Sequence, residues 1–178
     1  VTTEGALNLI DEEYIKEEAD KLMQSCGLSP QGAYIGLFIG GQSKKFRLDK
    51  ELVLKVIAEI KKASQEINAG ILLTTSRRTS AQVSALIKEE FKDYPGLKLM
   101  IIANERNIPE AVGGILGLSS VIVTSPESIS MISEAASSQC PTLVFHSAGL
   151  SPKHRAFLDN LARQNYIYLS APGDLSRE

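Results

Sequence analysis

From Val121 to Ala136 the chain carries the stretch VIVTSPESISMISEAA. A short apolar run here breaks into a turn rich in hydroxyl groups, and a helical pattern containing the acid Glu134 follows. This order predicts a strand, a ligand-binding loop and the N-terminus of a helix. Backbone N–H groups and the positive end of a helix dipole suit a phosphate, while a carboxylate about two turns in can accept hydrogen bonds from sugar hydroxyls. The expected ligand is a nucleotide or a nucleotide-sugar.

Short apolar runs alternate with amphipathic segments along the rest of the chain. The predicted strands cover residues 34–39, 71–75, 97–103, 121–124, 142–146 and 166–169, and the helices between them cover residues 49–68, 79–92, 109–118, 127–138 and 152–164. Strands that are apolar on both faces and separated by helices belong in a parallel sheet covered on both sides. The expected fold class is α/β, a Rossmann-like doubly wound, mostly parallel six-stranded sheet.

The length of 178 residues allows one substantial domain. We expect residues 1–29 to form a connector helix and a linker, with the helix over residues 10–26 and Gly27 as its stop. Residues 30–172 then form the α/β domain that binds the nucleotide-sugar, and residues 173–178 form a loose tail. Because the chain opens on Val1, we expect that an amino-terminal portion of a larger protein has been removed.

Composition narrows the class of protein. With 19 basic and 21 acidic residues the net charge is −2, which does not point to nucleic acid as a partner. No apolar run approaches the roughly 20 residues that cross a bilayer, and the amino end lacks the basic-then-apolar layout of a signal peptide, so a soluble cytoplasmic domain is expected. Cys26 and Cys140 lie far apart without metal-ligand spacing, which favours two reduced thiols. The chain also lacks a DxD-like acidic pair, so we expect no metal and no cofactor.

The loop after the first strand contains Gly40-Gly41-Gln42-Ser43-Lys44-Lys45-Phe46-Arg47. Paired glycines let a backbone approach an anion, and Ser43, Lys44 or Arg47 can complete its charge. The alternative is an ordinary Gly-Gly turn with solvated lysines, because neither GxGxxG nor a Walker P-loop is complete. Gly40, Gly41, Ser43 and Lys44 are therefore candidate ligand contacts.

The loops after the second and third strands supply further candidates. Arg77 and Arg78 are expected to open a helix at the same edge, where a guanidinium group can bind phosphate oxygens in a bidentate way, and Thr79 or Ser80 can cap that helix. Asn104 follows the third strand and is suited to the edge of a base. The alternatives are exposed arginines of a capped turn and ordinary polar loop content.

After the fourth strand the candidates are Ser125, Ser128, Ser130 and Glu134. With a helix start near residue 126 or 127, Ser130 and Glu134 lie one turn apart on a shared face, and we expect Glu134 to be half-buried. The alternatives are a plain N-cap for Ser128 and an exposed helix acid for Glu134. His146 and His154 lie near the same edge but have no partner at catalytic or metal spacing, so structural roles are favoured.

Three of these stretches, residues 39–48, 73–79 and 123–136, resemble the mitochondrial-fission Elm family. The resemblance covers roughly residues 30–170 and is to the carboxyl-terminal half of a family that resembles GT-B glycosyltransferases. In that half the resemblance implies a nucleotide-sugar donor site, with Glu134 as the ribose ligand. It also implies phosphate contacts by Gly40, Gly41, Ser43, Lys44, Arg77, Ser128 and Ser130.

The first hypothesis for function is a donor-binding domain of a metal-independent, GT-B-like glycosyltransferase. Because the acceptor half is absent, this chain alone is expected to bind a nucleotide-sugar without turning it over, and no catalytic residue is assigned. The expected partners are the nucleotide-sugar, the missing N-terminal domain of the same protein and a protein partner. The rivals are a non-catalytic interaction protein of the Elm family type and a nucleotide-binding regulatory domain. The location is expected to be cytoplasmic, or peripheral to a membrane in the full-length protein.

Overall fold

The computed structural model describes residues 5–42, 46 and 48–177. Its helices are α1 (Glu12–Cys26), α2 (Lys50–Glu66), α3 (Ala81–Glu90), α4 (Ala111–Leu118), α5 (Ile129–Ser137) and α6 (Pro152–Arg163). Its strands are β1 (Tyr34–Ile39), β2 (Gly70–Thr75), β3 (Leu97–Ile101), β4 (Val121–Thr124), β5 (Thr142–Phe145) and β6 (Tyr168–Ser170). The predicted helices and strands are confirmed, with some ends shifted by one or two residues.

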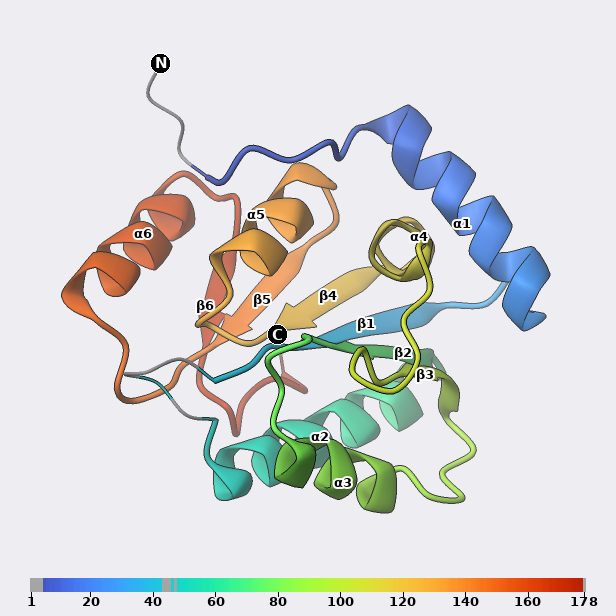
Figure 1. Cartoon of the computed structure of the whole chain (residues 1–178), viewed down its shortest axis with the longest axis horizontal. Helices are drawn as coiled ribbons and strands as arrows, with labels where there is room; N and C mark the ends of the chain where they lie inside the picture. Colours follow the sequence, from blue (N-terminus) through green and yellow to red (C-terminus); the bar gives the residue numbers. More distant parts are fainter. Residues whose placement is uncertain (1–4, 43–45, 47, 178) are drawn as a thin grey trace.

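The strands form a single six-stranded sheet in the order β3-β2-β1-β4-β5-β6. Every neighbouring pair is parallel, which confirms the predicted Rossmann-like α/β fold. The strand order reverses at β1, which pairs with β2 on one side and with β4 on the other. Right-handed crossovers then place α2 and α3 on one side of the sheet and α4, α5 and α6 on the other, together with α1 (Figure 1).

The central strands carry the core. All six residues of β1 and all six of β2 are buried, because helices cover both faces of the sheet there. Phe38 of β1 and Phe145 of β5 are the largest side chains that are fully buried. Burying a side chain of this size stabilises a fold by about 1.5–3 kcal/mol, so these strands hold the loops at their ends in fixed positions.

Side chains cap most of the helices at their N-termini. In four helices the residue before the first turn accepts a hydrogen bond from a backbone N–H of that turn: Asp11 before α1, Asp49 before α2, Ser80 before α3 and Ser151 before α6. Of the two residues predicted to cap α3, Thr79 and Ser80, the structure has Ser80 at the cap. Helices α4 and α5 have no side-chain cap of this kind.

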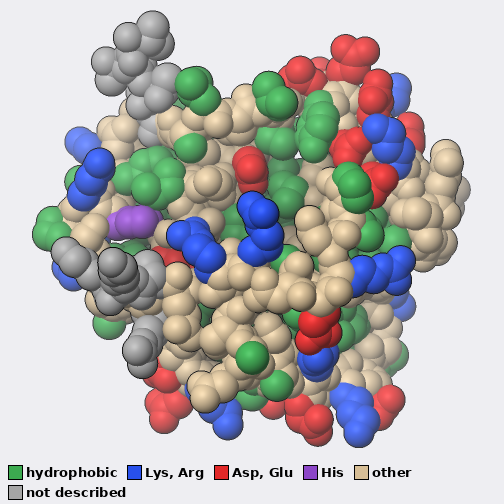
Figure 2. All heavy atoms as spheres, viewed as in Figure 1, with side chains coloured by type: hydrophobic (Ala, Val, Ile, Leu, Met, Phe, Trp, Pro, Cys, Tyr) green, Lys and Arg blue, Asp and Glu red, His purple; other side chains and the backbone are tan. Residues whose placement is uncertain are grey.

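The predicted connector helix, α1, packs closely against α4. A β-carbon added to Gly114 of α4 would lie 2.6 Å from the Leu22 β-carbon and 2.9 Å from the Glu18 carbonyl oxygen. Glycine is therefore needed at this position for the two helices to approach. The outer surface of α1 is acidic, and Figure 2 shows its carboxylates gathered at the upper right. No helix of the described residues is long and apolar enough to cross a membrane.

The segment after β6, for which the sequence predicts a loose tail, contacts the rest of the molecule. Leu175 is 5% exposed and belongs to the main hydrophobic core. The Ser176 hydroxyl donates a hydrogen bond of 2.5 Å to the Glu59 carboxylate of α2. This bond lowers the pKa of Glu59, since it stabilises the ionised form. These contacts hold the described part of the tail against the α2 side of the sheet.

Candidate functional site

The loops after β1, β2 and β4 meet at one edge of the sheet. Ile39 pairs with Thr75 and Phe38 pairs with Thr124, so the three strands end at nearly the same level. The backbone N–H of Ser76 then bonds the Ile39 carbonyl at 2.8 Å, and that of Ser125 bonds the Phe38 carbonyl at 3.1 Å. This edge lies where the strand order reverses, the usual ligand position in an open parallel sheet.

A carboxyl group absent from the sequence-based candidates, that of Glu127, lies at this edge of the sheet. Glu127 is only 8% exposed, and its Oε1 accepts a hydrogen bond of 3.1 Å from the Ser125 hydroxyl. The Ser125 Oγ in turn accepts a hydrogen bond of 2.7 Å from the Gly40 N–H. The Glu127 Oε2 is buried and has no hydrogen-bond partner among the described residues. The candidate Ser125 is therefore a buried link between two loops, and Glu127 is the side chain it orients.

The paired glycines, which were predicted to approach an anion, leave room for other parts of the protein. A β-carbon at residue 40 would lie 1.8 Å from the Glu127 Oε1, and one at residue 41 would lie 2.4 Å from the backbone carbon of Arg78. The space that a side chain would occupy is thus filled by the protein itself. The Gly-Gly pair makes room for a carboxyl group and a neighbouring loop, and contact of Gly40 and Gly41 with an anion stays a prediction.

The ionisation of Glu127 is strongly affected by this environment. Burial raises its pKa from 4.5 to about 7. Nearby backbone N–H groups of Glu127 and Gly41, the Ser125 hydroxyl and the charge of Arg78 oppose this shift without cancelling it. Carboxyl groups whose pKa is shifted toward neutrality are found at functional sites more often than elsewhere.

Arg77 and Arg78 lie in the turn between β2 and α3, and α3 begins only at Ala81. Both arginines are exposed, and neither side chain makes a salt bridge with the described residues. Thr79 is buried beside them, and its hydroxyl donates a hydrogen bond of 2.6 Å to the Gly40 carbonyl. The turn is therefore fixed to the β1 loop by Thr79, and contact of Arg77 or Arg78 with a phosphate stays a prediction.

The structure brings Asn104 to the same region but gives it a structural contact. Its side-chain amide donates a hydrogen bond of 3.0 Å to the Thr79 carbonyl, which joins the loops after β2 and β3. A contact between Asn104 and a base stays a prediction. The candidates Ser43 and Lys44, and Arg47 beside them, lie outside the described residues.

Helix α5 presents the remaining candidates. Ser128 precedes the helix and is buried, but its hydroxyl makes no capping hydrogen bond. Ser130 is exposed in the first turn, and Glu134 one turn later is half-buried, as predicted. Burial raises the pKa of Glu134, and its carboxylate makes no hydrogen bond with the described residues. Tyr14 of α1 lies close enough for the Glu134 charge to contribute to its raised pKa, after burial and Glu18.

The histidines and cysteines add no catalytic group to this arrangement. His146 follows β5, and its backbone N–H bonds the Ser170 carbonyl, while His154 contacts Phe157 edge to face in the first part of α6. Cys26 and Cys140 are both free thiols, as predicted, and burial raises the pKa of Cys140 to about 11. Within the described ranges, no three His, Cys, Asp or Glu side chains cluster as metal ligands would.

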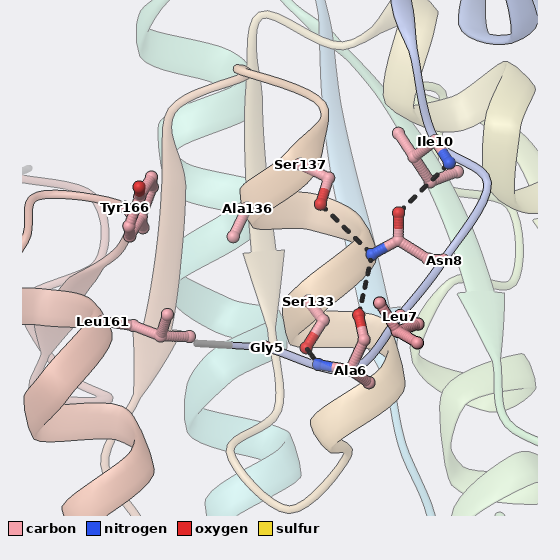
Figure 3. A pocket seen from close by; sticks show the side chains of 10 residues that line it. All are labelled: Gly5, Ala6, Leu7, Asn8, Ile10, Ser133, Ala136, Ser137, Leu161 and Tyr166. Atoms are coloured by element: carbon pink, nitrogen blue, oxygen red, sulfur yellow. Dashed lines mark hydrogen bonds between the residues drawn. The ribbon is translucent and has the colours of Figure 1, made fainter. Parts of the chain in front are cut away.

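Two pockets lie near the candidate residues. One of about 860 Å³ opens between the N-termini of α2 and α3 and includes Gln42, Asp49 and Ser80 in its lining. A second, of about 450 Å³, lies between residues 5–10, the second half of α5 and the end of α6 (Figure 3). In it the Ala6 N–H bonds the Ser133 hydroxyl and the Asn8 amide bonds the Ser137 hydroxyl. Of these two, the first adjoins the loops at the carboxyl ends of the strands; a further pocket, of about 300 Å³, lies at the loop after β5 and includes His146 and Arg155 in its lining.

The fold defines a Rossmann-like α/β domain with polar loops at the point where its strand order reverses. The family model described as mitochondrial fission ELM1 matches residues 1–174. The chain belongs to this family, which confirms the resemblance seen in the sequence.

A curated relative is an uncharacterised protein of Rickettsia prowazekii (strain Madrid E), which is 25% identical over 132 residues. The match covers 74% of this chain and 37% of the relative. The chain thus spans well under half of the length of the relative it matches.

The chain is similar to several solved structures. Wall teichoic acid polymerase TagF, in a single-residue variant, matches with a TM-score of 0.51 at 16% identity, over 95% of this chain and 39% of that one. YcaC from Pseudomonas aeruginosa matches with a TM-score of 0.50 at 13% identity, over 84% and 80% of the two chains. The ADP-heptose lipopolysaccharide heptosyltransferase II of E. coli matches with a TM-score of 0.48 at 18% identity, over 80% and 41%. At these identities the similarity concerns the fold alone.

Proposed function

We propose that this chain is the nucleotide-sugar-binding domain of a metal-independent, GT-B-like protein related to glycosyltransferases. The observation that carries the proposal is the meeting of three polar loops and the α5 N-terminus at the point where the strand order reverses. Anions bind well at helix N-termini, and the two free arginines after β2 can add charge. Membership of the ELM1 family and the fold shared with TagF support the proposal.

Glu134 is the proposed ribose ligand. It lies on α5 one turn beyond Ser130, is half-buried, and its carboxylate has no hydrogen-bond partner among the described residues. A carboxylate placed in this way can accept two hydrogen bonds from neighbouring hydroxyls of a sugar. The phosphates would then lie toward the start of α5, and the arginines would face them from the β2 side.

Catalysis, in this proposal, needs a second domain. The chain spans 37% of its Rickettsia relative, and no nucleophile or general base is assigned among the described residues at this edge of the sheet. We therefore propose that the rest of a longer protein supplies the acceptor site and the general base, and that this domain supplies the donor. A cytoplasmic location, or one at a membrane surface in the longer protein, belongs to the same proposal and is tested by cell fractionation.

Calorimetric titration with UDP, GDP, ADP and CMP and their common sugar conjugates tests the proposal. We expect saturable binding of one nucleotide in EDTA, with no gain on adding magnesium, because arginines and helix N–H groups supply the positive charge. Strict dependence on magnesium would contradict the metal-independent site. Silence across the panel, in the full-length protein as well, would contradict the function.

Substitution of Glu134 tests the assignment of the ribose ligand. Glu134→Ala is expected to weaken nucleotide binding by about ten-fold or more, because hydrogen bonds to a charged group contribute about 1.5–3 kcal/mol. Glu66→Ala, at the exposed end of α2, is the matched control and should bind as the wild type does. Unchanged affinity in a folded Glu134→Ala variant would remove Glu134 from the site.

A second function, binding of a protein partner without catalysis, is favoured by one observation. Leu7 and Leu9 are 89% and 86% exposed on the segment before α1, while Asn8 between them bonds Ser137. Large exposed apolar side chains often mark protein contacts. The double variant Leu7→Ser/Leu9→Ser should then no longer bind the partner protein, while its nucleotide binding stays unchanged. A double variant that still binds the partner would contradict this function.

A further inference from the structure

Residues 5–10 form an extended N-terminal segment that lies along α5 (Figures 1 and 3). The backbone N–H of Ala6 bonds the Ser133 hydroxyl at 2.9 Å, and the Asn8 side-chain amide bonds the Ser137 hydroxyl at 3.1 Å. Exposure alternates along the segment, as it does in an extended chain with one side against the protein. Leu7 and Leu9 are therefore held in solvent by a segment that is itself fixed to the fold.

The pocket beside these leucines suits apolar side chains. It has a volume of about 450 Å³ and lies between the N-terminal segment, α5 and α6, with Leu161 and Ala136 in its lining. Tyr166, at its rim, is 48% exposed. None of the described residues that line the pocket is charged, so an apolar side chain can enter without removing water from a charge.

Opposite charges lie at the two ends of the N-terminal segment. Helix α1 follows the segment, and its first turn contains the exposed acids Glu12 and Glu13. At the other end, the exposed Arg163 lies in the last turn of α6, close in the chain to the pocket residues Leu161 and Tyr166. Figure 2 shows the same division, with carboxylates over α1 and Lys and Arg side chains over α6.

These charges are not paired within the chain. Glu12, Glu13 and Arg163 make no salt bridge with any residue that the structure describes. Helix α1 as a whole contains five acidic and two basic residues, whereas α6 contains three Lys or Arg and one Asp. One face of the molecule thus has an apolar centre, an acidic end and a basic end.

A second copy of the chain is complementary to this face. In a dimer with two-fold symmetry, the same face of both copies is in contact. With the two segments antiparallel, Leu7 of one copy meets Leu9 of the other, and the acidic end of each copy meets the basic end of the other. A parallel arrangement would bring like charges together. An apolar centre with a polar rim is the usual composition of a protein interface.

We propose that residues 5–10, the adjoining pocket and the neighbouring ends of α1 and α6 form a homodimer interface, in which two copies pack antiparallel about a two-fold axis. The leucines are buried at its centre, and Arg163 of each copy pairs with Glu12 or Glu13 of the other. The interface goes beyond the proposed function and does not depend on it, because none of the loops after β1, β2 and β4 belongs to it.

Sedimentation equilibrium of the whole chain, from micromolar to millimolar concentration, tests the interface. We expect a reversible equilibrium between monomer and dimer. The variant Leu7→Ser/Leu9→Ser should dimerise about a hundred-fold more weakly, since four buried leucines are lost from each dimer. A wild type that stays monomeric, or a double variant that dimerises as the wild type does, would overturn the interface. A monomeric wild type that binds a different protein through these leucines would overturn it too.

Exchange of charges tests the antiparallel packing. Glu12→Lys/Glu13→Lys and Arg163→Glu should each weaken dimerisation by about ten-fold, because like charges then meet at both ends of the interface. In an equimolar mixture of the two variants, opposite charges meet at both ends again, so a heterodimer of about wild-type strength should form. Lys55→Glu, at an exposed position of α2, is the control and should dimerise as the wild type does. A mixture that associates no better than either variant alone would overturn the proposed packing.

Discussion

Glu127 links the stability of the fold to pH. Burial raises its pKa from 4.5 to about 7, so between these values the folded chain binds more protons than the unfolded chain. The stability that comes from this proton is fully present below pH 4.5 and is lost as the pH rises through 7. A shift of this size corresponds to about 3 kcal/mol of unfolding free energy.

Replacing Glu127 by Gln should therefore raise the melting temperature by several degrees at pH 8 and change it little at pH 5, because the amide cannot ionise. Thermal unfolding followed by circular dichroism measures this. Glu59→Gln is the control with the opposite sign, since the pKa of Glu59 is lowered by Ser176 and its stabilisation is present only above the ordinary pKa. A Glu127→Gln variant that melts at or below the wild-type temperature at pH 8 would show that the carboxyl is not destabilised by burial.

Gly40 is predicted to be intolerant of any side chain because of the same carboxyl. Gly40→Ala would place a β-carbon 1.8 Å from the Glu127 Oε1 and should lower the unfolding free energy by about 1–3 kcal/mol. Adding Glu127→Ala removes the nearest clash, so the double variant should lose less than the sum of the two single losses. Urea denaturation of the four proteins measures this; strictly additive losses would mean that residue 40 and the carboxyl do not touch.

The periodicity of apolar residues predicted the helices and strands better than the residues of the turns predicted where each helix begins. The apolar strands and the stripes of the helices identified every element of the sheet, because burial on one or both faces leaves a direct trace in the sequence. Helix α5 was expected to begin near residue 126 or 127, where Pro126 and an acid suit a first turn, but it begins at Ile129. The Glu127 carboxyl instead packs against Gly40, where a side chain at residue 40 would otherwise lie.

The contact between α1 and α4 gives a prediction that separates local propensity from packing. Gly114→Ala should gain about 1 kcal/mol of helix propensity. The added carbon would, however, approach the Leu22 β-carbon and the Glu18 carbonyl too closely, so we expect a net loss of about 1–2 kcal/mol. Gly173→Ala, which meets open space, is the control. A stabilised Gly114→Ala variant in urea denaturation would show that α1 does not pack on α4 in this way.

At the scale of the whole molecule, the sequence predicted which edge of the sheet carries the candidate residues. It did not predict the contacts between the loops at that edge. The order of strands and helices placed Arg77, Ser125 and Glu134 at one edge, since parallel strands bring their carboxyl ends together. The role of Gly40 and the burial of Glu127 depend on contacts between loops that are 87 residues apart in the chain, from residue 40 to residue 127. No local pattern contains such contacts.

The location of a bound nucleotide tests the proposed function most directly. Backbone amide resonances of the whole chain would be followed by NMR during titration with UDP, GDP, ADP and CMP. We predict that one nucleotide shifts the amides of Gly40, of the turn at residues 76–79 and of residues 125–130, and leaves residues 5–10 unaffected. Shifts confined to the pocket of residues 5–10 and α5, or no shift from any nucleotide at millimolar concentration, would contradict a donor site at the carboxyl ends of the strands.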